Sequence, residues 1–132
     1  MRNFLRGILL VGAMTLTVTA VAQLPGLVPK IVELDTHGHD YLAVLSGPPE
    51  TAGMRSGLVV LTPQKSVGRH STGQNEEVLI VLEGRGEMLF GDGHRLTVEA
   101  KHAVYCPPRT VHDVKNTGRS VLRYVYVVAN LR

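Results

Sequence analysis

The chain has 132 residues, 44% of them hydrophobic and 19% charged, with a formal net charge of +3. This length fits one domain with a single modest core. No two lysine or arginine residues are adjacent, and no basic stripe contains aromatic side chains, so the composition argues against a nucleic-acid partner. The single cysteine, Cys106, rules out an internal disulfide and is expected to be a small buried hydrophobe.

The N-terminus has the pattern of a secretory signal peptide. Arg2 and Arg6 precede an apolar stretch over 7–22, which ends with Ala20 and Ala22 around one further residue. This pattern predicts cleavage after Ala22 and a periplasmic or secreted protein without membrane contact after cleavage. A retained anchor helix is the alternative, but a stretch of about 16 residues is shorter than the roughly 20 that normally span a bilayer.

The rest of the chain is a succession of short apolar segments separated by proline and glycine clusters. Each segment is too short for a helix and rich in valine and leucine, so each is predicted to be a β-strand. Short strands with such frequent turn signals are typical of an all-β sandwich or small barrel. The predicted strands cover 30–34, 41–45, 58–61, 78–82, 86–90, 95–99, 103–106, 112–115 and 121–128.

Two turns organise this succession. The loop "GPPET" over 47–51 separates an N-terminal arm with strands at 23–52 from a barrel at 53–132, and the signal peptide occupies 1–22. Farther on, Asp92-Gly93 predicts a hairpin with a two-residue turn, because both central residues of such a turn need positive φ angles.

The segment from Val78 to Leu82 is apolar at every position. A strand with one wet face would alternate apolar and polar residues, so this strand is expected to be covered on both faces. Its outer side is therefore predicted to pack against another sheet or against a partner subunit, which favours a homodimer.

This same strand opens with groups that are costly to bury unless they are paired or bound to a metal. Successive side chains of a strand point to opposite faces, so one of Glu76 and Glu77 points inward. The loop over 71–75 allows His70 to fold back beside them. A third polar group, His112, follows a Pro-Pro turn later in the chain.

These residues resemble the two sequence motifs of the cupins. The first, roughly G-x5-H-x-H-x3-4-E-x6-G, corresponds to His70, Thr72, Glu77 and Gly84; the second, G-x5-P-x-G-x2-H-x3-N, corresponds to Pro107, His112 and Asn116. The resemblance spans about residues 64–116 and implies a double-stranded β-helix, or jelly-roll barrel. This fold agrees with the predicted strands.

The sequence departs from the motifs at four positions. Thr72 replaces the second histidine of the first motif, and Gln64, Lys101 and Arg109 replace glycines. The glycine changes concern turns, whereas Thr72 concerns the site.

In cupins the three histidines and the glutamate bind a divalent metal, so the resemblance implies a metal site at His70, Glu77 and His112. Thr72 and Gln74 are possible auxiliary ligands. Two imidazoles and a carboxylate suit Fe, Mn, Ni or Zn, and ligand type alone does not choose among them. The alternative is a metal-free barrel in which the histidines hydrogen-bond to an organic ligand.

A second histidine pair, His37 and His39, lies in "THGHD". On a strand both imidazoles would share a face and could bind a metal. The intervening Gly38 and the flanking aspartates favour a surface turn instead.

Three functions follow from these observations. The chain is predicted to be a metal-dependent cupin that acts on a small molecule, for example as a dioxygenase. Alternatively, it is a non-catalytic module that binds a small molecule or a metal. A sugar isomerase or epimerase is the third alternative, although no proton-transfer pair for it is evident.

Overall fold

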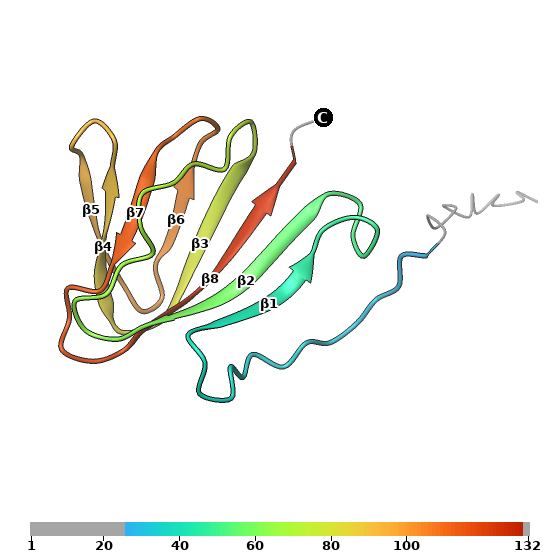
Figure 1. Ribbon diagram of the computed structural model, residues 1–132, viewed down its shortest axis with the longest axis horizontal. Coiled ribbons are helices and arrows are strands. Elements are labelled where there is room, and N and C mark those ends of the chain that lie inside the picture. Colours follow the sequence, from blue (N-terminus) through green and yellow to red (C-terminus); the bar gives the residue numbers. More distant parts are fainter. Residues whose placement is uncertain (1–25, 131–132) are drawn as a thin grey trace, which may run out of the picture.

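The computed structural model describes residues 26–130, so the predicted signal peptide lies outside the described part of the chain. Within this range the structure contains β-strands and no helix that could cross a membrane. The eight strands are β1 (Tyr41–Ser46), β2 (Met54–Leu61), β3 (Glu76–Glu83), β4 (Arg85–Phe90), β5 (Arg95–Glu99), β6 (Ala103–Cys106), β7 (His112–Lys115) and β8 (Leu122–Ala129) (Figure 1).

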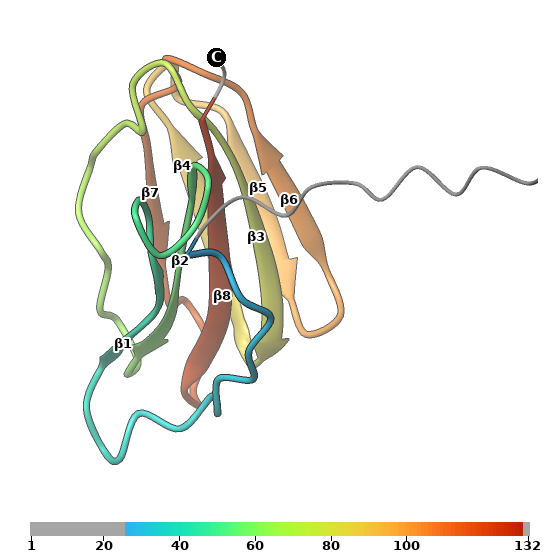
Figure 2. The same cartoon turned by 90° about the vertical axis from the view of Figure 1, so that its right-hand side faces the viewer.

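The strands form two antiparallel sheets that face each other. One sheet has the order β1-β2-β8-β3-β6 and the other has the order β5-β4-β7. Figures 1 and 2 show the two layers from directions at right angles. This architecture confirms the prediction of an all-β double-stranded β-helix, or jelly-roll barrel.

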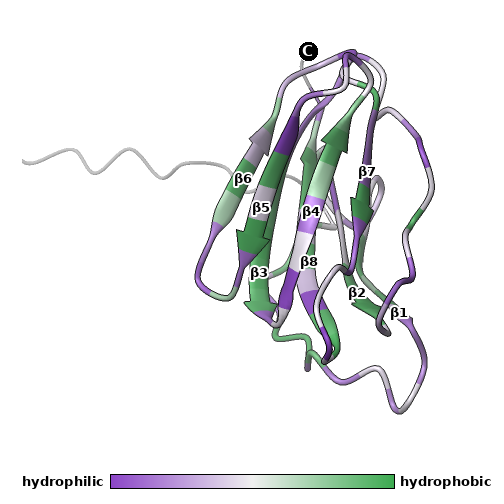
Figure 3. Cartoon of the chain, turned by 90° about the vertical axis from the view of Figure 1, so that its left-hand side faces the viewer, coloured by the Kyte–Doolittle hydropathy of each residue, from purple (hydrophilic) through white to green (hydrophobic). Residues whose placement is uncertain are grey.

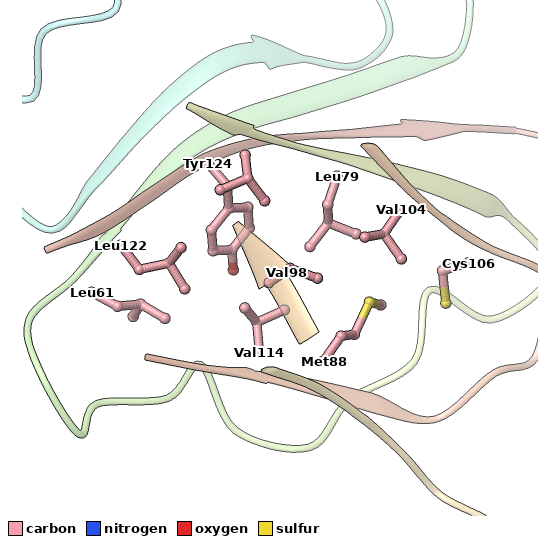
Figure 4. Packing of buried hydrophobic residues seen from close by; sticks show 10 residues of the cluster. Leu61, Leu79, Met88, Val98, Val104, Cys106, Val114, Leu122 and Tyr124 are labelled. Atoms are coloured by element: carbon pink, nitrogen blue, oxygen red, sulfur yellow. The ribbon is translucent and has the colours of Figure 1, made fainter. Parts of the chain in front are cut away.

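The core lies between the sheets because the strands alternate buried and exposed residues. On β3, for example, Glu77, Leu79 and Val81 are buried while their neighbours are more exposed. Figure 3 shows the hydropathy of the strands, with hydrophobic (green) and hydrophilic (purple) residues both present along β4 and β5. Figure 4 shows the buried cluster, which includes Leu79 from the larger sheet and Met88 from the smaller one.

Two predicted local structures are wrong. Residues 30–34 form no strand; they belong to an extended arm in which the Ile31 side chain is 96% exposed and has no neighbouring strand to pair with. The hairpin between β4 and β5 exists, but its loop comprises Gly91, Asp92 and Gly93, and of these only Gly93, at 89°, has a positive φ. Such a three-residue loop combines a type I turn with one left-handed residue.

The outer face of β3 is not covered by another sheet within residues 26–130. Ile80 and Leu82 are 42% and 44% exposed, and Tyr105 on the neighbouring β6 is 59% exposed. The prediction that a second sheet of the same chain covers this face is therefore wrong, and the alternative of a partner subunit stays a prediction.

The three motif glycines that this sequence lacks correspond to left-handed backbone positions. Gln64, Lys101 and Arg109 have φ angles of 70°, 74° and 61°. The turns of this fold therefore need the conformation that glycine adopts freely, although the chain places longer side chains there.

Candidate metal centre

His70 reaches the barrel by pairing with β7. The segment before it runs alongside β7, with a bridge between Ser66 and Lys115 and another between His70 and His112. The backbone amides of His70 and His112 each donate to the other's carbonyl at 2.9 Å. This reciprocal pair places the two imidazoles on the same side, with ring centroids 4.4 Å apart.

Glu77 is the glutamate that points inward. Its side chain is 5% exposed, whereas the Glu76 carboxylate lies on the outer face and accepts a hydrogen bond from the Tyr105 hydroxyl at 3.1 Å. Glu77 belongs to the larger sheet and His112 to the smaller one, so the site lies between the two layers.

The three predicted ligands converge. His70, Glu77 and His112 each offer one ligand atom, and these atoms all lie within 4.8 Å of one another. His112 Nε2 is 3.2 Å from Glu77 Oε2. Adjacent ligands of a transition metal with bond lengths of about 2.0–2.2 Å are separated by a similar distance.

Backbone carbonyls orient both imidazoles. His70 Nδ1 donates to the Gly68 carbonyl at 2.8 Å, and His112 Nδ1 donates to the Thr110 carbonyl at 3.1 Å. In a neutral imidazole with a protonated Nδ1, the lone pair is on Nε2. This is the arrangement by which proteins direct histidine ligands toward a metal.

The buried atoms of the site support metal binding. Glu77 Oε2 and His112 Nε2 are both buried, and within the described structure each has only the other beside it, at 3.2 Å and outside hydrogen-bond geometry. Burial favours the neutral form of His112, but contacts with Glu77 and the Thr110 carbonyl outweigh it and raise the pKa of His112. Buried polar atoms that lack hydrogen bonds are costly, and a divalent ion between these two would bind both. The residues of the site therefore fit the predicted divalent metal ion.

The two proposed auxiliary ligands occupy different places. Thr72 is half-buried and lines the same pocket as the histidines, but its hydroxyl donates to the Asn75 carbonyl at 3.1 Å. Gln74 is exposed, and its Oε1 accepts a hydrogen bond from Arg109 Nε at 3.1 Å. Gln74 is not among the residues that line the pocket.

The "THGHD" segment forms an exposed turn. The amide of His39 donates to the Thr36 carbonyl, and the amide of His37 donates to the Asp35 carboxylate at 2.8 Å. This local hydrogen bonding agrees with the predicted turn.

Two other polar residues near the site have structural contacts. Asn116, fully buried, donates from Nδ2 to the carbonyls of Leu61 and Ser120 and accepts from the Gly118 amide, so it joins β2 to the loop between β7 and β8. Cys106 is buried as predicted, and its Sγ lies 3.2 Å from His112 Nδ1. Motif spacing does not reveal the contact between Cys106 and His112, because this contact depends on where β6 ends relative to β7.

The candidate ligands lie in a pocket of about 750 Å³ between the sheets. Its walls also contain Tyr41, Arg55 and Tyr126, which the sequence did not mark as a group. Pockets of this size typically bind small organic molecules. The arrangement can thus hold an ion and a small molecule side by side.

Comparison with known proteins assigns the family. Residues 57–128 match the sequence model of the Cupin_2 family, described as a cupin domain. This match covers more than half of the chain, which therefore belongs to the cupin family, and it includes all three candidate ligands.

Individual relatives add the following. An uncharacterized protein of Methanocaldococcus jannaschii is 35% identical over 54 residues, and this match covers 41% of the chain and 42% of that protein. A Cupin 2 conserved barrel domain protein from Salinispora arenicola has a TM-score of 0.65 at 25% identity, covering 78% of this chain and 90% of that one. The cupin domain of Schizosaccharomyces pombe Cnp3 has a TM-score of 0.62 at 15% identity, covering 69% of this chain and 64% of that one, and this likeness concerns the fold alone.

Proposed function

We propose that the chain binds a divalent transition metal through His70, Glu77 and His112 and presents it to a small molecule in the adjoining pocket. The observation that supports this most is that Glu77 Oε2 and His112 Nε2 face each other at 3.2 Å in a buried site, with no hydrogen bond to either atom in the described structure. Two histidines and one carboxylate leave other positions of the metal open for water or a ligand.

Metal titration with matched variants tests this proposal. Metal-free protein is titrated with Mn(II), Fe(II), Ni(II) and Zn(II) by calorimetry. Glu77→Gln is expected to weaken binding at least tenfold, because an amide is a poorer ligand than a carboxylate. Glu76→Gln is the control, since the Glu76 carboxylate on the same strand lies on the outer face with Tyr105. Equal affinities of the two variants would contradict the proposal.

We further propose that the site is catalytic and uses dioxygen on its small-molecule ligand. Two histidines and a carboxylate form the ligand set of non-haem iron oxygenases, and iron in such a set supplies the means to activate oxygen. In this proposal, the carbonyls of Gly68 and Thr110 hold the histidine rings, and the pocket walls orient the ligand.

The alternative is binding without catalysis. It is favoured by Thr72, which stands where the family pattern has a further histidine and whose hydroxyl is engaged by Asn75. Oxygen uptake by the Fe(II)-loaded protein, measured with and without small organic ligands, separates the two functions. Uptake that needs both iron and Glu77 supports the enzyme. Tight ligand binding without uptake supports the non-catalytic module.

We propose that the chain forms a homodimer through the outer face of β3 and β6. Ile80, Leu82 and Tyr105 expose apolar surface there, and burying it against a second copy would be favourable. Ile80→Glu should shift the mass in solution from dimer to monomer. Val67→Glu, at a similarly exposed apolar residue on the segment that runs beside β7, should not. A wild-type monomer at micromolar concentration would contradict this proposal.

We also propose export and cleavage after Ala22, on the strength of the sequence pattern. N-terminal sequencing of protein from the producing cell is expected to start at Gln23. A chain that still begins at Met1 would contradict it.

A further inference from the structure

The pocket has a second charged end opposite the candidate metal centre. Arg55 on β2 and Glu77 on β3 are both paired with Val128 on β8, one from each side. All three side chains line the pocket, so they lie in one row across the inner face of the sheet. Two interstrand spacings of about 4.8 Å put the backbones of Arg55 and Glu77 roughly 10 Å apart.

The charge of Arg55 is available to a ligand. Its stem packs against Gly47, where an added Cβ would lie 3.0 Å from Arg55 Cγ. No carboxylate within residues 26–130 forms an ion pair with its guanidinium, whereas Arg123 pairs with Glu83 at 3.4 Å. A guanidinium presents a fork of donors that matches a carboxylate.

Two tyrosines stand beside Arg55 in the same pocket. The hydroxyls of Tyr41 and Tyr126 lie 3.0 Å apart, and the rings meet over Gly57, where an added Cβ would lie 2.8 Å from each ring. One hydroxyl donates to the other, which leaves the second with a proton to donate to a ligand. Burial and the hydrogen bond with Tyr41 raise the pKa of Tyr126 to about 12, so it remains a donor at neutral pH.

We propose that Arg55, Tyr41 and Tyr126 form an anion subsite that binds the carboxylate of a small organic acid, whose other end faces His70, Glu77 and His112. Asp40 also lines this pocket and opposes an anion, so binding depends on the guanidinium. The inference deepens the proposed function by naming the ligand class. It rests on the proposed metal centre only for the statement that the other end of the acid faces His70, Glu77 and His112.

The probe is succinate, a four-carbon dicarboxylate, compared with its neutral diamide succinamide. Both are titrated by calorimetry into the metal-free and the Mn(II)-loaded protein at one ionic strength. We expect succinate to bind at least tenfold more tightly than succinamide in both forms. Arg55→Gln should remove most of this preference, and Arg55→Lys should retain part of it. Arg119→Gln, which removes an exposed positive charge beside a different surface hollow, should leave it unchanged.

The tyrosines are tested without disturbing the packing of their rings. Tyr126→Phe keeps the ring over Gly57 and removes the hydroxyl, so we expect succinate affinity to fall at least threefold. The Mn(II) affinity of Arg55→Gln and Tyr126→Phe should stay within threefold of the wild-type value. A larger change would mean that these residues act on the metal centre and would overturn their role as a separate subsite.

The outcomes separate this inference from the proposed metal centre. If Mn(II) binds with the expected dependence on Glu77 but succinate and succinamide bind equally, or succinate does not bind, the carboxylate subsite is wrong. If Mn(II) does not bind but succinate retains its Arg55-dependent preference, the subsite holds and the metal centre is wrong. Equal succinate affinity of wild type and Arg55→Gln also overturns the inference.

Discussion

Replacing Lys101 with glycine should stabilise the protein. Lys101 has a φ of 74°, and its exposed side chain forms no hydrogen bond or ion pair within the described structure. Its amide donates to the Val81 carbonyl at 3.0 Å, a bond that glycine preserves. The substitution therefore changes the backbone preference and little else.

The magnitude follows from two opposing terms. A non-glycine residue in the left-handed region costs about 1–2 kcal/mol. Glycine loses more conformational entropy on folding, at a cost of about 0.5–1 kcal/mol. The free energy of unfolding should thus rise by about 0.5–1 kcal/mol, which corresponds to a melting temperature higher by roughly 2–8 °C for a domain of this size.

The assay is urea unfolding followed by far-UV circular dichroism on wild type, Lys101→Gly and Lys101→Ala. Alanine removes the same side chain but keeps the steric clash, so it should bring no gain. If the glycine variant is no more stable than the alanine variant, the left-handed strain at this turn is not as described. The reverse change, Gly93→Ala, should cost about 1 kcal/mol, because its added Cβ would meet nothing within 4 Å and only the φ of 89° opposes it.

Three further predictions concern the site and its surroundings. Asn116→Ala should lower the free energy of unfolding by about 1–3 kcal/mol, measured by the same assay, because it leaves the buried Leu61 carbonyl without its partner; a loss below about 0.5 kcal/mol would contradict this role. Thr72→His should tighten metal binding at least tenfold by adding a ligand, and an unchanged calorimetric affinity would show that position 72 does not face the ion. Burial raises the pKa of Cys106 to about 11, and the charge of Glu77 adds to this effect. Between about pH 9 and 11 the unfolded chain loses its thiol proton while the native chain keeps it, so the free energy of unfolding should fall as the pH rises through this range. Native Cys106 should correspondingly resist iodoacetamide at pH 8 until guanidinium is added, and rapid native labelling would refute its burial.

Sequence patterns predict the strands well where local composition and pairing agree. The valine-rich β3 and β8 and the hairpin around Gly93 were expected because β-branched residues and turn residues act locally. The arm at 30–34 has a similar composition but no strand beside it. Ile31 shows that apolar composition alone does not make a strand.

Part of the candidate site was likewise predictable from the sequence, and part was not. Motif spacing predicted that His70, Glu77 and His112 would converge, because the register of a cupin barrel determines which of its residues meet. The anion subsite was out of reach, since Arg55 and Tyr126 come from distant parts of the sequence. They meet only through the register of β2 on β8 and the missing side chain of Gly57.

The candidate ligands come from both layers of the sandwich, with Glu77 on the five-stranded sheet and His112 on the three-stranded one. An ion bound between them would therefore cross-link the two sheets. At a free metal concentration a thousandfold above the dissociation constant, this cross-link would stabilise the folded chain by about 4 kcal/mol. Loss of the metal would thus lower the stability of the fold as well as abolish the function of the pocket.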